Sequence, residues 1–449
     1  MKNLKKKLVA LLLVMAIILP VIPVLAESVP MEGPKISPWA MGDITDSQFI
    51  GIMEISQETL AKDYTKPATQ DELKKLKEQF EIKLSSTGME SKNEFKEEKV
   101  DEKLTRGKVL LDIYNILGKY DKNISGETEP IKYLAENKIL RGKGTDYNLD
   151  DEVTLEEAFV FYVRAIKKFY ADNDLGGKGV FYKIENKGNT VYLFGSIHLG
   201  DYKMYPINAS RMNAFEEADE LFVELNTQDS KMIQEVQGMQ FRTDGKKLKD
   251  ELGEELYKEY QEIATSLGME ESMYENLDGW AVLNQLLMIP TLTQNPISPI
   301  IGIDNYLITL ANLSGKSIIS LETVETQKET LKKFYGDNED ALLENIKEAI
   351  EIIKSEEKMA ESLKGVDNLI NIWNEGNEKA LGTMFEEDES AKILTSARDP
   401  EMAKKIIDLL ESKDKKTSFV LVGAGHYAPN GSVVDIIEKA GYIVENLNK

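Results

Sequence analysis

Residues 191–198 read VYLFGSIH, and residues 418–426 read SFVLVGAGH. In both stretches an apolar run typical of a buried β-strand is followed by Gly-x-x-His, and these motifs hold the only two histidines of the chain. Glycine at the carboxyl end of a strand lets the backbone turn or approach a neighbour closely. We therefore expect Gly195 and Gly423 to place the histidines on loops above one edge of a sheet, where open α/β sheets bind ligands. A single histidine of this kind is more often structural, but the repeated pattern favours a shared function.

Five side chains are candidates for chemistry. Imidazole can ligate a metal or move protons near neutral pH, which makes His198 and His426 the first two. Glu224 ends an apolar strand-like run, and a carboxylate buried there needs a metal, a cation or a proton, the alternative being a strand-end salt bridge. Glu322 ends a second such run and has a helix N-terminus as its alternative interpretation. Arg398 could hold an anionic group or an oxyanion, or it could start a surface helix.

The region around these motifs alternates strands with helices. Strand-like runs are predicted at 180–184, 190–194, 220–224, 317–320, 417–422 and 442–444. Helical patterns are predicted at 207–219, 246–288, 303–315, 326–360, 367–385, 398–412 and 432–441. Residues 186–189 read NKGN, which is typical of a hairpin turn. The alternation predicts an α/β domain.

A polar, Gly-rich stretch at 172–179 predicts a domain boundary. We expect a helical region at 27–175 and an α/β domain at 176–449. The helical region is rich in Lys and Glu and has few strand signals. The length of 449 residues is consistent with two or three domains, each of which can bury its own core.

The helical region contains a degenerate repeat. Thr69, Thr105 and Thr154 each begin a helix-like run, at uneven spacing. Thr154 is followed three residues later by Glu157, which is the pattern of a capping box at a helix N-terminus.

This region resembles S-layer homology modules, which hold bacterial surface proteins to cell-wall polymers. The matching features are Trp39-Ala40, Leu134 followed by Ile139-Leu-x-Gly142, and the run Thr154-Leu-Glu-Glu157-Ala that leads to Arg164-Ala165. The resemblance implies a small all-α domain with a cell-wall polymer as partner. A helical domain that packs on the second half and has no affinity for the wall is the alternative.

Residues 1–26 have the order of an export signal. Four lysines precede an apolar run, which is broken by Pro20 and Pro23 and ends in Val24-Leu-Ala26. We expect cleavage after Ala26 and a secreted or surface-retained mature chain, with an uncleaved anchor helix as the alternative. No later segment is apolar for 18 residues, so no further membrane span is expected.

Composition excludes several classes of function. The chain has 55 Lys and Arg against 78 Asp and Glu, and its formal net charge of −23 disfavours nucleic acid as a partner. It has no cysteine, which excludes disulfides, thiol nucleophiles, cysteine–zinc sites and iron–sulfur clusters.

Residues 178–449 are similar to the TraB/GumN family, which includes the Tiki metalloproteases and the pheromone-shutdown proteins. The shared motifs, in chain order, are Gly195-Ser-Ile-His198-Leu-Gly, Tyr205-Pro206, Ala218-Asp219, Val223-Glu224-Leu, Gly302-Ile-Asp304, Leu307, Ala311, Gly315-Lys316, Leu321-Glu322-Thr, Gln327, Arg398, Gly423-Ala-Gly-His426 and Gly441-Tyr-x-Val444. The chain departs from the family at two places. Asp399 stands where the family often has Asn, and Tyr427-Ala-Pro replaces the usual continuation beside the second histidine.

The resemblance implies a TraB/GumN, Tiki-like α/β domain with a mixed sheet and many helices. It also implies a metal-dependent hydrolase that acts on peptides or proteins, with a divalent ion (Mn, Co, Zn or Fe) held by His198, His426, Glu224 and Glu322. A glutamate not bound to the ion would act as general base, and Arg398 would stabilise the oxyanion. Without a metal, His198 would be the base and Glu224 would orient it. A peptide- or pheromone-binding protein without turnover is the alternative function.

Overall fold

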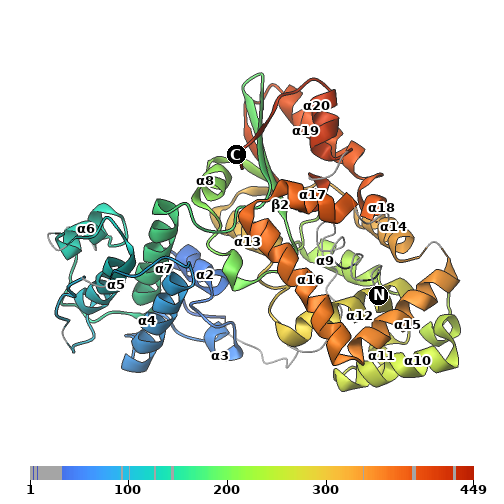
Figure 1. Cartoon of the computed structure of the whole chain (residues 1–449), viewed down its shortest axis with the longest axis horizontal. Helices are drawn as coiled ribbons and strands as arrows, with labels where there is room; N and C mark the ends of the chain where they lie inside the picture. The colour runs from blue at the N-terminus through green and yellow to red at the C-terminus, as the bar shows by residue number, and fades with distance from the viewer. Residues whose placement is uncertain are drawn as a thin grey trace. The chain divides into compact units, whose positions relative to one another are not determined.

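The computed structural model describes Leu4, Leu8 and residues 33–92, 95–100, 102–125, 128–142, 146–336, 338–386, 391–427 and 431–448. The predicted export signal at 1–26 lies outside the described residues, apart from Leu4 and Leu8. The chain divides into two compact units, shown in Figure 1. The helical unit comprises Val29–Gly177 and Tyr202–Met212, and the sheet unit includes Lys178–Asp201 and Asn213–Lys449. The division after Gly177 falls within the Gly-rich stretch at 172–179.

The helical unit is organised around one amphipathic helix, α7. Its helices are α2 (Met41–Ile50), α3 (Gln57–Leu60), α4 (Gln70–Ser85), α5 (Arg106–Tyr120), α6 (Pro130–Glu136) and α7 (Leu155–Asp172), with a 3₁₀ turn at Tyr202–Met204. The capping box predicted at Thr154 is confirmed, because its side chain accepts from the N–H of Glu157 and its own N–H donates to the Glu157 carboxylate. Helices α2, α4 and α5 all pack against α7, so this helix supplies much of the core of the unit.

The sheet unit alternates strands with helices, as predicted. Its strands are β1 (Phe181–Asn186), β2 (Asn189–Ser196), β3 (Glu220–Val223), β4 (Ser317–Ser320), β5 (Thr417–Gly423) and β6 (Val444–Asn446). The helices that follow β2 are α8 (Ala209–Glu217), α9 (Ser230–Gly238), α10 (Leu248–Ser266), α11 (Glu271–Tyr274), α12 (Gly279–Gln294), α13 (Ile303–Ser314), α14 (Val324–Tyr335), α15 (Glu339–Ile353), α16 (Glu356–Glu375), α17 (Glu378–Glu386), α18 (Ala391–Thr395), α19 (Asp399–Glu411) and α20 (Val433–Lys439). A 3₁₀ turn at Ala424–His426 follows β5 directly.

The strands of the described residues form one mixed sheet in the order β4-β3-β5-β2-β1-β6. Strands β4, β3, β5 and β2 are parallel, whereas β1 is antiparallel to β2 and to β6. The predicted hairpin is confirmed, because Asn186 pairs with Asn189 across its turn. Carboxyl ends of parallel strands meet at one sheet edge. The ends of β2, β5 and β3 are therefore close together, with Ser196 opposite Gly423 in the register.

Helices pack on the sheet and on one another. Helix α19 lies against β1 and β2, and α12 packs against α10, α14, α15 and α16 (Figure 1). Helix α12 is buried along most of its length, which fits its apolar sequence. The single helical run expected at 246–288 is divided into α10, α11 and α12, and α10 itself is kinked at Gly253, whose φ is 74°.

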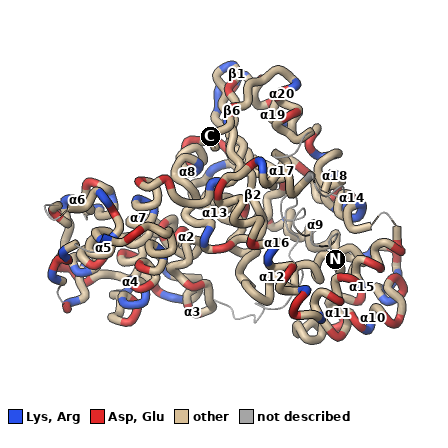
Figure 2. Tube along the Cα trace, in the orientation of Figure 1, with Lys and Arg blue, Asp and Glu red and all other residues tan. Residues whose placement is uncertain are grey.

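The acidic excess is not confined to one unit. Acidic and basic residues are both spread along helices of the helical unit and of the sheet unit (Figure 2). None of the helices in the described part of the chain combines the length and the apolar composition that crossing a membrane requires.

Candidate functional site

The two Gly-x-x-His motifs touch each other at Gly195. A Cβ atom on Gly195 would lie 2.3 Å from Cγ2 of Val180 and 2.8 Å from Cα of Ala424, which is too close for any larger residue. Nε1 of Trp373, on α16, donates a hydrogen bond of 2.7 Å to the carbonyl of Gly195. The glycine therefore lets the ends of β2 and β5 approach, and the tryptophan holds the first loop in place.

Each histidine is held at Nδ1 by an aspartate from a different helix. Nδ1 of His198 lies 2.8 Å from Oδ2 of Asp304, in the first turn of α13. Nδ1 of His426 lies 2.5 Å from Oδ1 of Asp399, the first residue of α19. Ser196 donates to the other oxygen of Asp304 at 2.8 Å, so that carboxylate is also held from β2. With Nδ1 held in this way, each ring is oriented by its carboxylate.

Glu224 lies between the two imidazoles, directly after β3. Its Oε1 is 3.9 Å from Nε2 of His198 and 3.8 Å from Nε2 of His426, and all three side chains are buried. The same Oε1 accepts a hydrogen bond of 2.7 Å from the backbone N–H of Gly423. The parallel pairing of β3, β5 and β2 thus brings together the two histidines and the glutamate that the sequence singled out.

The imidazoles face Oε1 of Glu224, whereas Arg398 binds the other oxygen, Oε2, and also binds Glu322. Nη2 of Arg398 donates to Oε2 of Glu224 at 2.7 Å, and Nε and Nη2 each donate to Glu322 at 2.7 Å. Nη1 donates to the carbonyl of Leu394 at 3.1 Å, and the arginine side chain has no exposed surface. Gln327 adds hydrogen bonds of 3.2 Å to both glutamates. Both oxygens of Glu322 therefore contact the guanidinium, and the structure does not bring this predicted ligand to the histidines.

The electrostatics of the site favour a positive charge between the imidazoles and Glu224. Burial raises the pKa of Glu224, but Arg398 and the two histidines outweigh it and leave the pKa below its usual value. Burial lowers the pKa of His198, but Asp304 and Glu224 outweigh it and leave the pKa raised. Burial also lowers the pKa of Arg398, and its two glutamates more than reverse this effect. Glu224 is thus held as an anion, and His198 binds a proton or another cation more readily than an exposed histidine.

The donor atoms fit a divalent transition metal, whereas their spacing is wider than a closed metal site requires. Nε2 of His198 is buried without a hydrogen-bond partner among the described residues, and two imidazole nitrogens with a carboxylate oxygen suit Zn, Mn, Co or Fe. Among the described residues, however, no group of three or more His, Asp or Glu side chains is arranged to hold an ion as the structure stands. The separations of 3.9 and 3.8 Å exceed the roughly 3.4 Å between neighbouring ligands of a tetrahedral zinc with bonds of about 2.1 Å.

Two residues of the site were not among the functional candidates from the sequence. Asp304 entered only as part of the Gly302-Ile-Asp304 motif, and Asp399 only as a departure from the family pattern. Each stands in the first turn of a helix, where an acidic residue is ordinarily explained by the helix dipole. The structure shows how α13 reaches the first histidine: Gly302 approaches the His198 backbone so closely that a Cβ on this glycine would lie 2.4 Å from the His198 carbonyl oxygen.

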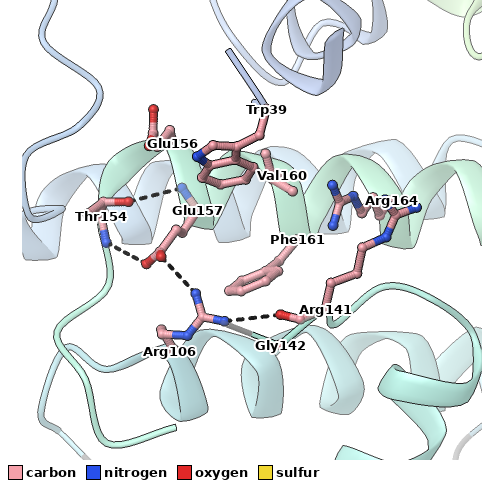
Figure 3. A pocket seen from close by; sticks show the side chains of 10 residues that line it. All are labelled: Trp39, Arg106, Arg141, Gly142, Thr154, Glu156, Glu157, Val160, Phe161 and Arg164. Atoms are coloured by element: carbon pink, nitrogen blue, oxygen red, sulfur yellow. Dashed lines mark hydrogen bonds and ion pairs between the residues drawn. The ribbon is translucent and has the colours of Figure 1, made fainter. Parts of the chain in front are cut away.

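The helical unit contains a separate pocket of about 480 Å³, shown in Figure 3. It is lined by Trp39, Arg106, Arg141, Gly142, Thr154, Glu156, Glu157, Val160, Phe161 and Arg164. Trp39 is 53% exposed, which is unusual for a residue with so large an apolar side chain. The pocket thus combines an exposed aromatic surface with three guanidinium groups.

The carboxylates of this pocket are already paired. Glu157 lies 2.8 Å from Nη1 of Arg106, and Glu156 accepts hydrogen bonds of 2.9 and 2.7 Å from Ser37. Arg164 is paired with Asp43 at 2.9 Å, outside the lining. Among the described residues the Arg141 guanidinium makes no ion pair.

The sheet unit is similar to a known protein family. Residues 180–446 match the TraB/PrgY/gumN family. The chain is 24% identical over 315 residues to a protein named "Metalloprotease TIKI homolog" from Nematostella vectensis, covering 57% of this chain and 64% of that protein. It is 24% identical over 311 residues to "Metalloprotease TIKI2" from Xenopus tropicalis, covering 57% of each chain. The chain therefore spans less than two thirds of the length of these curated relatives. No solved structure gives a significant match.

Proposed function

The chain belongs to the TraB/PrgY/gumN family, and on that premise we propose that it is a metal-dependent hydrolase that cleaves peptides or proteins. The observation that carries the proposal is the convergence of Nε2 of His198 and Nε2 of His426 on one oxygen of Glu224. A peptide-binding protein would have no need for two buried, aspartate-supported imidazoles facing a charged carboxylate. The relatives named as metalloproteases support the same reaction class.

The residues that would hold the ion are His198 and His426 through Nε2, and Glu224 through Oε1. The chemistry supplied by a divalent ion in such a place is activation of a water molecule and polarisation of a carbonyl group. Glu322 is not included in this set, because Arg398 contacts both of its oxygens.

The chain's own residues prepare this site in two ways. Arg398 and the N–H of Gly423 fix the two oxygens of Glu224 separately, so that Oε1 faces the histidines in a defined orientation. Because its pKa is lowered, Glu224 is ionised at neutral pH and supplies the negative charge that a bound cation would need. Arg398, fully buried and bonded to both glutamates, acts by holding them rather than by contacting the substrate oxyanion.

A cleavage assay tests the proposal. Full-length protein is stripped with a chelator, supplied separately with Zn, Mn, Co or Fe, and incubated with a peptide library whose products are identified by mass spectrometry. We expect cleavage with at least one ion and none after stripping. His198→Ala should abolish cleavage, while Lys132→Gln, at an exposed position of the helical unit, should not. Peptides that are retained but left intact with every ion would support the binding alternative instead.

We further propose that the pocket of the helical unit binds an anionic cell-wall polymer. Trp39 offers an exposed ring on which a sugar can stack, and Arg141 offers a guanidinium whose charge the described residues leave unpaired. Burial is the main effect that lowers the pKa of Arg164, and Asp43 counteracts it. The charge of Arg141 lowers the pKa of Arg164 further, so the two guanidinium groups are close to each other. Two neighbouring guanidinium groups, of which only Arg164 is paired with a carboxylate among the described residues, favour an anionic ligand.

Sedimentation with purified cell wall tests this second role. The full-length protein should sediment with walls that carry anionic polymers, and Arg141→Gln should weaken binding roughly tenfold or more, as expected for a lost charge-assisted hydrogen bond. Lys132→Gln removes the same charge from an exposed position on α6 and should leave binding unchanged. Equal sedimentation of the wild type and the Arg141 variant would exclude the pocket as the binding site.

Export of the chain is also proposed, from the order of charged, apolar and small residues at 1–26. The mature protein should then begin at Glu27. N-terminal sequencing of protein from the culture medium and from wall extracts checks this. Recovery of only the form that begins at Met1, in the membrane fraction, would show an uncleaved anchor.

A further inference from the structure

We propose that Asp304 and Asp399 are positioning residues that keep a proton on Nδ1 of each imidazole, so that His198 and His426 both present an unprotonated Nε2 toward Glu224. The inference rests on the proposed function of this site and deepens it, because a ligand or base acts through the nitrogen that bears no proton. It assigns a task to two aspartates that contact the rings at Nδ1, whereas Nε2 is the nitrogen nearer to Glu224.

The aspartate that contacts His198 belongs to α13, the helix that begins after Gly302, and Gly302 lies close to the His198 backbone. Asp304 is the second residue of α13, and Gly302 precedes that helix as its N-cap. Ser196 donates to Oδ1 of Asp304 at 2.8 Å and leaves Oδ2 facing Nδ1 of His198 at 2.8 Å. Oδ1 of this carboxylate is therefore fixed by a hydrogen bond, whereas Oδ2 meets the ring in a close charge contact and has no hydrogen bond from the described residues.

The contact of His426 is more deeply buried. Asp399 is 2% exposed and is the first residue of α19, where the helix N-terminus favours a negative charge. The carboxylate lies 2.5 Å from Nδ1 of His426, a separation typical of a strong, charge-assisted hydrogen bond.

The two contacts have the same chemical consequence although they come from different helices. An ionised carboxylate only accepts hydrogen bonds, so the imidazole nitrogen beside it must be the one that carries a hydrogen. In a neutral ring the other nitrogen, Nε2, is then an acceptor. The nitrogens that face Oε1 of Glu224 then carry no hydrogen of their own, an arrangement that favours a cation beside the carboxylate.

Nuclear magnetic resonance of the ring nitrogens tests the inference directly. The chain has only two histidines, so full-length protein labelled with ¹⁵N-histidine and stripped of metal gives two ring systems without crowding. At a pH where both rings are neutral, we expect Nδ1 to be protonated and Nε2 to be unprotonated in both rings of the wild type. In Asp304→Asn the amide can donate to Nδ1, and we expect Nδ1 of His198 to lose its proton while His426 is unchanged. Asp399→Asn should give the reciprocal result, and Asp304→Glu should restore the wild-type pattern at His198.

The affinity for Zn²⁺ alone, measured by competition with a chelating dye, is the second readout. Each Asn variant should bind Zn²⁺ roughly 10–100-fold more weakly, as expected for loss of an outer-shell carboxylate. Asp250→Asn is the matched control, because Asp250 is also a first-turn helix aspartate, and its carboxylate accepts a hydrogen bond of 2.9 Å from the backbone N–H of Lys247. Its Zn²⁺ affinity should not change.

The inference is overturned if Nδ1 is unprotonated in either ring of the wild type, a result that does not depend on whether a variant folds. It is also overturned if both Asn variants keep Nδ1 protonated and bind Zn²⁺ as the wild type does. Failure of the wild type to cleave any peptide, with Nδ1 protonated and Zn²⁺ bound, would overturn the proposed hydrolysis and leave this inference standing.

Discussion

The backbone N–H of Gly423 donates a 2.7 Å hydrogen bond to Oε1 of Glu224, so the second Gly-x-x-His motif is bonded directly to the residue after β3. This bond crosses the boundary between two parallel strands, since β5 and β3 are neighbours. Oε2 of the same carboxylate is bound by Arg398. The orientation of Glu224 therefore depends on the sheet register and on one arginine, and both can be tested.

Glu224→Gln should lower the rate of peptide cleavage by about 10²–10⁴-fold, because the neutral amide can replace neither a charged ligand nor a basic oxygen. The fold should persist, since the amide is nearly isosteric and can still accept from Gly423. Glu220→Gln is the control at the opposite end of β3, where the carboxylate bonds to Lys416 and Ser418. Cleavage rates are read by mass spectrometry. Equal rates for the wild type and Glu224→Gln would show that this carboxylate has no part in the reaction.

Arg398→Met should lower the free energy of unfolding by about 3–5 kcal/mol, because it leaves two buried glutamates without their cation. Adding Glu322→Gln to the same variant should recover part of the loss, since one uncompensated charge is removed. Urea unfolding followed by circular dichroism measures both. An unchanged midpoint for Arg398→Met would mean that the guanidinium is not the structural partner of these carboxylates.

Divalent metal should raise the melting temperature of the stripped wild type, because an ion bound only by the folded state stabilises it by mass action. His198→Ala and His426→Ala should each lose most of that increase, since the two rings face the same oxygen of Glu224. Differential scanning fluorimetry with and without Zn²⁺ is sufficient. Identical metal-induced shifts in all three proteins would refute a shared site.

Gly195→Ala should destabilise the sheet unit by about 1–3 kcal/mol, because its Cβ would overlap Val180 and Ala424. Gly238→Ala is the matched control: this glycine lies in α9 and a Cβ there would meet nothing within 4 Å. The control should be neutral or slightly stabilising, since alanine favours a helix. Thermal unfolding of both variants makes the comparison. A Gly195→Ala variant as stable as the control would show that the strand ends can separate without cost.

The strands could be predicted from the sequence because each is a short β-prone run bounded by turn residues. Periodicity and the repeated Gly-x-x-His pattern were enough to bring His198, His426 and Glu224 to one sheet edge. Arg398 and Glu322 were also chosen from the sequence, but their mutual contact was not, because an ion pair between residues 76 positions apart depends on how α19 and the end of β4 pack.

The aspartates behind the histidines could not be recognised in the same way. Nothing in the local sequence separates Asp304 or Asp399 from an acidic residue that merely stabilises a helix N-terminus. Helix boundaries between 246 and 288 were also missed, because the apolar pattern continues across Gly253 and Gly268, where positive φ angles interrupt the helix. In both cases the deciding information lies in tertiary contacts or in backbone angles that the pattern of apolar residues does not encode.

The helical unit is discontinuous in the chain, since Tyr202–Met212 returns to it after β2 has been completed. Tyr205 packs on Phe49 with ring centroids 5.5 Å apart, and Asn208 donates to Asp174 at 2.8 Å. A fragment that stops at Gly177 would lack these buried partners and would expose the apolar surface that they cover. The unit is thus not a detachable module: gene fusions, limited proteolysis and domain exchange that treat residues 29–177 as self-sufficient would yield an incomplete core.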